Sequence, residues 1–134
     1  MSLQFSTPLR NAWLNLIEST IGTSPVMQIR TGAPPASCVA VATGTLLVTI
    51  SLPVDWMAAS SAGTKVKAGT WAATSTFSGE PGHFRIYDAL GTTCGVQGTA
   101  SVTGGAGDMI VNVTPVVSGF QFTVTAFTFT APGG

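Results

Sequence analysis

The chain has 134 residues, of which 45% are hydrophobic and only 7% are charged, with five acidic residues balancing five Lys and Arg. Because soluble domains typically carry about 25% charged residues, we interpret this nearly uncharged surface as one that neighbouring subunits cover in a homo-oligomer, with a neutral, Thr-rich monomer as the alternative. The scattered basic residues argue against nucleic acid as a partner, and no run approaches the roughly twenty apolar residues that cross a membrane.

The first element in chain order is a helix within residues 1–24, which we treat as an N-terminal arm and helix. Thr7 is a suitable N-cap, Pro8 fits the first helical position, and Gly22 is placed to end the helix. The N-terminus has neither a basic start nor an apolar run before a cleavage site, so we expect no secretory signal and synthesis in a cytoplasm.

An apolar stripe makes this helix amphipathic. Its residues recur at helical spacing and are Leu9, Trp13, Leu16, Ile17 and Ile21. The stripe must pack either on the chain's own sheet or on the same helix of a second copy, and the pattern leaves both open. We therefore take Leu9, Trp13, Leu16 and Ile17 as candidate inter-subunit contacts, with a core role as the alternative.

Residues 25–130 have the pattern of a single β domain. Short segments rich in Val, Ile, Thr and Phe alternate with Gly and Pro turns about every ten residues. The predicted strands are 26–31, 45–52, 65–76, 83–88, 93–102, 108–114 and 120–130. No crossover helices that would connect parallel strands are evident, so we predict an antiparallel β-sandwich or a barrel, jelly-roll-like in form. Residues 131–134 are predicted to be a short Gly-rich tail.

The last predicted strand breaks the alternation of buried and exposed residues. Phe120 and Phe122 fall on one face, whereas Phe127 and Phe129 have the opposite parity. Either a β-bulge near Ala126 returns the phenylalanines to one face, or both faces of the strand are covered. Phe120 and Phe122 are further candidate inter-subunit contacts, again with a core role as the alternative.

The residues that catalysis needs are scarce in this chain. His83 is the only histidine, and strand alternation places it on the opposite face from Asp88. There is no Gly-x-Ser-x-Gly motif, no pair of carboxylates close in sequence and no metal-ligand spacing. We assign no catalytic, cofactor-binding or metal-binding residue, and we expect a protein that is not an enzyme and needs no cofactor.

The two cysteines, Cys38 and Cys94, are too few for a disulfide framework. If they meet, closing so long a loop would stabilise the fold by about 4 kcal/mol in the chain-entropy model. Because the cytoplasm is reducing, the sequence favours two buried free thiols over a disulfide.

Seven segments together carry a resemblance to a family of small, uncharacterised proteins of tailed bacteriophages and prophages. They are 9–12 (LRNA), 17–24 (IESTIGTS), 29–38 (IRTGAPPASC), 52–59 (LPVDWMAA), 82–88 (GHFRIYD), 91–94 (GTTC) and 107–109 (GDM). The resemblance implies a virion structural protein and brings no catalytic or ligand residue with it. It is also consistent with Cys38 and Cys94 being neighbours in the fold.

From this resemblance and the low charge we expect a capsid-associated auxiliary or decoration protein. It would be assembled in the host cytoplasm, reside in the virion, and bind the major capsid protein or other virion proteins. The alternative is a tail, connector or fibre-associated protein with a role in host adhesion, which exposed aromatic residues around Trp56, Trp71 and Tyr87 would favour. A small cell-wall hydrolase, which would depend on His83, is the third and weakest alternative.

Overall fold

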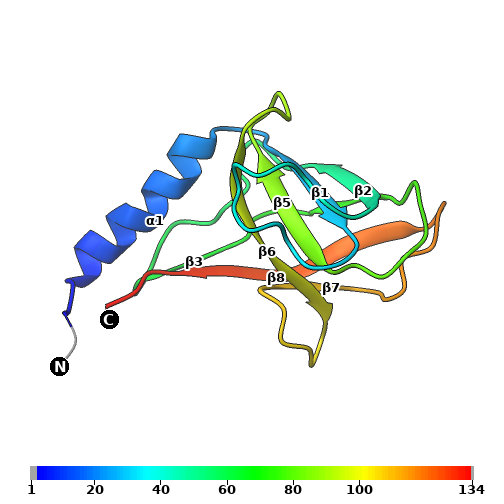
Figure 1. Cartoon of the computed structure of the whole chain (residues 1–134). Coiled ribbons are helices and arrows are strands. Elements are labelled where there is room, and N and C mark those ends of the chain that lie inside the picture. The colour runs from blue at the N-terminus through cyan, green and yellow to red at the C-terminus, as the bar shows by residue number, and fades with distance from the viewer. Residues whose placement is uncertain (1–2, 134) are drawn as a thin grey trace.

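The structure is a computed structural model that describes residues 3–133, and this part of the chain is mainly β. It holds one helix, α1 (Thr7–Ile21), and eight strands (Figure 1). The strands are β1 (Val26–Arg30), β2 (Leu46–Ser51), β3 (Thr64–Val66), β4 (Ala72–Thr74), β5 (His83–Tyr87), β6 (Cys94–Val102), β7 (Met109–Val111) and β8 (Gln121–Thr130). The predicted class, a mainly β domain with one N-terminal helix, is confirmed.

The strands form one sheet in the order β2-β1-β5-β6-β7-β8-β3, and β4 pairs with the first half of β8. All pairs are antiparallel except β6 with β7. Within the described residues, β2 and β3 end this path without pairing to each other, so the sheet is not closed into a barrel. The mostly antiparallel arrangement is as predicted, whereas the closed-barrel alternative is not adopted.

The parallel pairing of β6 and β7 differs from the prediction that every connection would be antiparallel. Between the two strands, a short Gly-rich segment turns the chain back and then forward again. Hydrogen bonds with β6 hold this segment. The Gly107 N–H donates to Ser101 Oγ at 2.9 Å, and the Asp108 carboxylate accepts from the Thr99 N–H at 3.0 Å. A Cβ at Gly107 would lie 2.6 Å from the Ser101 nitrogen, so this close return requires glycine.

A β-bulge resolves the break in alternation along β8, as one of the two predicted alternatives has it. Val124 and Ala126 pair with consecutive residues of β7, which leaves Thr125 as an additional residue. Phe122 and Phe127 can therefore both be buried on the same side, although their parity differs. The bulge lies one residue from the position expected.

The predicted strand 65–76 is two strands, because the chain turns between them. Gly69 has φ +71° at this turn, and the Trp71 indole N–H donates to the Ala68 carbonyl at 3.0 Å. The two halves pair with opposite ends of β8, β3 with its end and β4 with its beginning. One continuous strand could not make both pairings.

The core lies between the β1, β2 and β5 strands and the β7 and β8 strands. Trp56 and Trp71 are fully buried in it, with ring centroids 6.1 Å apart. Phe127 contacts Trp71 at 5.8 Å and Phe84 at 5.2 Å between centroids, so the aromatic chain joins β8 to β5 across the core. Such contacts contribute about 0.5–1.5 kcal/mol each beyond the burial of area.

Cys38 and Cys94 form a disulfide, with their Cα atoms 5.4 Å apart. The free-thiol interpretation is therefore wrong. Residues 31–44 connect β1 to β2 by folding back over β5 and β6, which brings Cys38 to the first residue of β6. In Figure 1 this segment, in cyan, passes across β5. The spacing of the two cysteines in the sequence does not indicate that residues 31–44 fold back in this way.

The described part of the predicted tail, residues 131–133, is held in place. Ala131 is buried, and its carbonyl accepts from Arg10 NH2 at 2.7 Å. The Phe5 N–H donates to the Gly133 carbonyl at 2.8 Å, so the segment before α1 and the end of the chain lie side by side. Gly134 lies outside the described residues. Residues 131–133 therefore lie outside any strand but pack against the segment before α1.

Candidate functional site

The limits of α1 follow from its capping residues. Ser6, one residue before the predicted Thr7, is the N-cap, and its Oγ accepts from the Leu9 N–H at 3.3 Å. Pro8 lies in the first turn, and Gly22 ends the helix with φ +96° as its N–H donates to the Glu18 carbonyl.

Only one edge of the predicted apolar stripe of α1, Ile17 and Ile21, packs on the protein. The buried residues are Leu14 and Ile21, with 2% and 9% of their surface exposed. Leu9, Trp13 and Leu16 are 50%, 43% and 58% exposed. Because successive helical residues are about 100° apart, the buried face is turned roughly a quarter of a turn from the centre of the stripe. Among the predicted contacts on α1, only Ile17 packs partly against the core.

Polar contacts hold the other side of α1 to the sheet. Lys65 on β3 is 3% exposed, and its Nζ lies 2.9 Å from Glu18 Oε1 and 2.9 Å from Asn15 Oδ1. The Gly63 N–H donates to Asn11 Oδ1 at 2.9 Å. Lys65–Glu18 is the one ion pair among residues 3–133. An amphipathic surface helix ordinarily turns its polar side to water, whereas here polar groups help to attach the helix and the apolar residues Leu9, Trp13 and Leu16 are left largely exposed.

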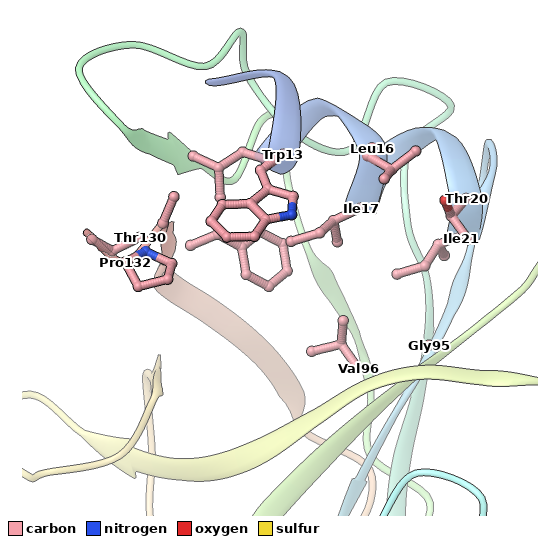
Figure 2. A pocket seen from close by; sticks show the side chains of 12 residues that line it. Trp13, Leu16, Ile17, Thr20, Ile21, Gly95, Val96, Thr130 and Pro132 are labelled. Atoms are coloured by element: carbon pink, nitrogen blue, oxygen red, sulfur yellow. The ribbon is translucent and has the colours of Figure 1, made fainter. Parts of the chain in front are cut away.

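An apolar groove runs between α1, the start of β6 and the end of β8, with a volume of about 560 Å³. Figure 2 shows Ile17 and Ile21 of α1 and Val96 of β6 bordering the space, with Trp13 toward Thr130 and Pro132. A Cβ at Gly95 would lie 2.6 Å from Ile21 Cγ1, so glycine lets the helix approach β6 at this end. The lining contains no charged residue and consists of Trp13, Leu14, Leu16, Ile17, Thr20, Ile21, Gly95, Val96, Phe129, Thr130, Ala131 and Pro132.

A second exposed apolar surface, the phenylalanine patch, consists of Phe77, Val117 and Phe120, which are 58%, 45% and 68% exposed. Backbone hydrogen bonds join the two segments that carry it, such as Ser75 N–H to the Phe120 carbonyl at 2.9 Å. The patch precedes β8, whereas the groove lies at the end of β8, and a ten-residue strand is roughly 30 Å long. Phe122, the other predicted contact, is fully buried in the core.

The residues tied to the alternative functions are buried. Trp56 and Trp71 are fully buried and Tyr87 is 9% exposed, so no exposed aromatic cluster forms around them. His83 is fully buried, and its Nδ1 lies 2.8 Å from the Gly32 carbonyl. Residues 3–133 contain no group of three potential metal ligands, and no helix in this range is long and apolar enough to cross a membrane.

Sequence reasoning missed the residues that attach α1. The burial of Leu14 had a visible signal, because Leu14, Ile17 and Ile21 are spaced i, i+3 and i+7 and form an alternative stripe. The Lys65–Glu18 pair had none, since its members are separated by most of the first half of the chain.

Comparison with protein-family models, with curated proteins and with solved structures finds no match to this chain. The resemblance to small proteins of tailed bacteriophages therefore stays a prediction that depends on the sequence segments given above.

Proposed function

We propose that this protein is a structural subunit of a virion, most directly a capsid-associated auxiliary or decoration protein that acts through contacts with other protein surfaces. The observation that supports this proposal most strongly is the orientation of α1. Its polar side is bound to β3 by Lys65, and Leu9, Trp13 and Leu16 face outward beside an uncharged groove. Exposed apolar side chains of this kind beside a groove are typical of protein interaction sites.

Because a single contact of this kind is weak, it favours assembly in many copies. Burying the exposed halves of Leu9, Trp13 and Leu16 would contribute roughly 2–4 kcal/mol, taking about 1.5–3 kcal/mol for a whole side chain. Association itself costs an estimated 4–15 kcal/mol or more. The helix face alone is therefore too weak for a tight complex. Repeated contacts between linked subunits in a shell or ring would supply the remainder.

The partner that suits the groove is the phenylalanine patch of a second copy. Both surfaces lack charged residues, and they lie at opposite ends of β8. A patch that fits a groove elsewhere on the same molecule makes head-to-tail contacts, which close into a ring when the rotation allows. The same chain in a symmetric homo-oligomer would thus cover both surfaces and leave other faces for the major capsid protein or other virion proteins.

Mixing two variants tests this contact. Leu16→Asp disables the groove side and Phe120→Asp disables the patch side, while Leu90→Asp is the control because Leu90 is 85% exposed and belongs to neither surface. We expect the wild type and the control to form oligomers and each disabled variant to be monomeric. An equimolar mixture should form dimers and nothing larger, because one intact groove meets one intact patch. If either disabled variant alone associated as strongly as the wild type does, the head-to-tail contact would be contradicted.

The virion setting is tested separately by the copy number of the protein in purified particles. Quantitative mass spectrometry against the major capsid protein should find it in many copies per particle. A handful of copies would favour the alternative, a tail, connector or fibre-associated protein. Absence from particles whose genome encodes it would remove the virion proposal and leave the head-to-tail contact to be judged by the mixing experiment.

A further inference from the structure

A buried arginine lies beneath the segment 31–44, on the face of β5 away from the core. Arg85 is 2% exposed, and its NH2 donates to the carbonyls of Cys38 at 2.6 Å and Ala40 at 3.0 Å. Its Nε and NH1 have no hydrogen-bond partner. Among residues 3–133 no carboxylate forms an ion pair with it. A guanidinium stays protonated in proteins, and burying a charge without a counter-charge is costly.

Two neighbours on the same face are also incompletely bonded. His83 Nδ1 pairs with the Gly32 carbonyl, which leaves Nε2 without a partner. Gln97, directly opposite Arg85 on β6, donates its Nε2 to the Pro35 carbonyl at 2.7 Å and leaves Oε1 without a partner. In the described part of the chain, every buried side-chain polar atom without a partner belongs to these three residues. Such clustering indicates a place for a bound species.

The space for a ligand is a cavity of about 380 Å³ that Arg85 and Tyr87 line together with Thr92, Thr93 and the segment 38–42. This is many times the roughly 30 Å³ that a water molecule occupies in the liquid. The Tyr87 ring lies 5.5 Å from the guanidinium carbon and shields one side of it. No acidic residue lines the cavity, so the guanidinium is its only formal charge.

The geometry points to an oxyanion-binding site at Arg85, which takes a phosphate, sulfate or carboxylate group. The charged guanidinium attracts such a group, and because NH2 is bonded to two carbonyls, the two nitrogens without partners remain to donate to its oxygens. Of the three incompletely bonded residues, only Arg85 lines the cavity, so the site depends on its guanidinium. The group could belong to a free ion or to a carboxylate side chain of a neighbouring subunit.

Thermal unfolding of the disulfide-intact chain tests the site with sodium phosphate, sulfate and acetate against chloride at equal ionic strength. A ligand that binds only the folded state raises Tm with saturation, and calorimetric titration should give one site per chain. A saturable rise in Tm with phosphate and sulfate but not with acetate would identify an inorganic ion as the ligand. A saturable rise with acetate would identify a carboxylate group.

The variant Arg85→Met should lose the response, and Arg30→Met should keep it. Arg30 is the matched control, since its guanidinium is bonded to Gln28 Oε1 at 3.0 Å and lies on the neighbouring strand β1. If Arg85→Met does not fold, Arg85→Lys replaces it and should weaken binding at least tenfold, because its single nitrogen cannot donate both to the carbonyls of Cys38 and Ala40 and to the bound group. No saturable response to any of the three anions in the wild type, or an equal response in the Arg85 variant, would overturn the site.

Discussion

Two leucines on the same helix distinguish the face of α1 that packs on the protein from the face that is free. Leu14 is 2% exposed and Leu16 is 58% exposed. The apolar stripe predicted from the sequence contains Leu16 and omits Leu14. Replacing each leucine with alanine therefore separates the orientation in the structure from one in which the stripe packs on the chain's own sheet.

The expected magnitudes differ severalfold. Leu14→Ala removes a buried side chain and leaves a cavity, which typically costs 2–5 kcal/mol. We expect about 3 kcal/mol, because Leu14 borders an open groove into which the remaining side chains can relax. Leu16→Ala removes a half-exposed side chain and places alanine, the best helix former, on the helix. We expect it to change the free energy of unfolding by about 0.5 kcal/mol or less.

Urea denaturation at low protein concentration, where the chain is monomeric, measures both changes. Circular dichroism and tryptophan fluorescence should give coincident transitions with unchanged slopes. A cost at Leu16 equal to that at Leu14 would refute the orientation of α1 and, with it, the outward apolar face. A small cost at both positions would mean that the helix is not packed on the sheet at all.

Three further changes test other parts of the fold. Replacing Cys38 and Cys94 together with Ser should lower the free energy of unfolding by about 4 kcal/mol, measured by urea titration against the oxidised wild type. Lys65→Ala should cost about 2 kcal/mol, as expected for losing a hydrogen-bonded charge whose partner Glu18 can regain water; an unchanged urea midpoint would contradict the buried ion pair. Hydrogen bonds, first from the Thr92 N–H, hold the pKa of Asp88 below its ordinary value of 3.8. The stabilisation is thus complete above that value and lost as the pH falls through the lower folded pKa, so Asp88→Asn should show a smaller loss of Tm on acidification below about pH 4 than the wild type.

Much of the fold could be predicted from the sequence because it depends on local residue patterns. Pro8 and Gly22 marked the helix, and the alternation of Val, Ile and Phe marked most strands. The parity break along Phe122 and Phe127 predicted either a bulge or a strand covered on both faces, and the bulge is the alternative adopted. These features depend on residues close together in the chain.

The parts that could not be predicted depend on contacts between distant residues. The disulfide needs residues 31–44 to fold back over β5, and no local pattern reports that return. The orientation of α1 depends on Lys65, far along the chain, whose ion pair with Glu18 favours the polar side of the helix over its larger apolar stripe. Arg85 is one of the scattered basic residues of the sequence, and no local pattern indicates that its guanidinium is buried.

Sedimentation of the purified chain over a wide range of concentration tests the central claim, that other subunits cover the outward apolar face of α1. The wild type should gain mass above the monomer as concentration rises, and Leu16→Asp should remain monomeric under the same conditions. A wild-type chain that stays monomeric and soluble at the highest concentration, with Leu16→Asp indistinguishable from it, would contradict the claim.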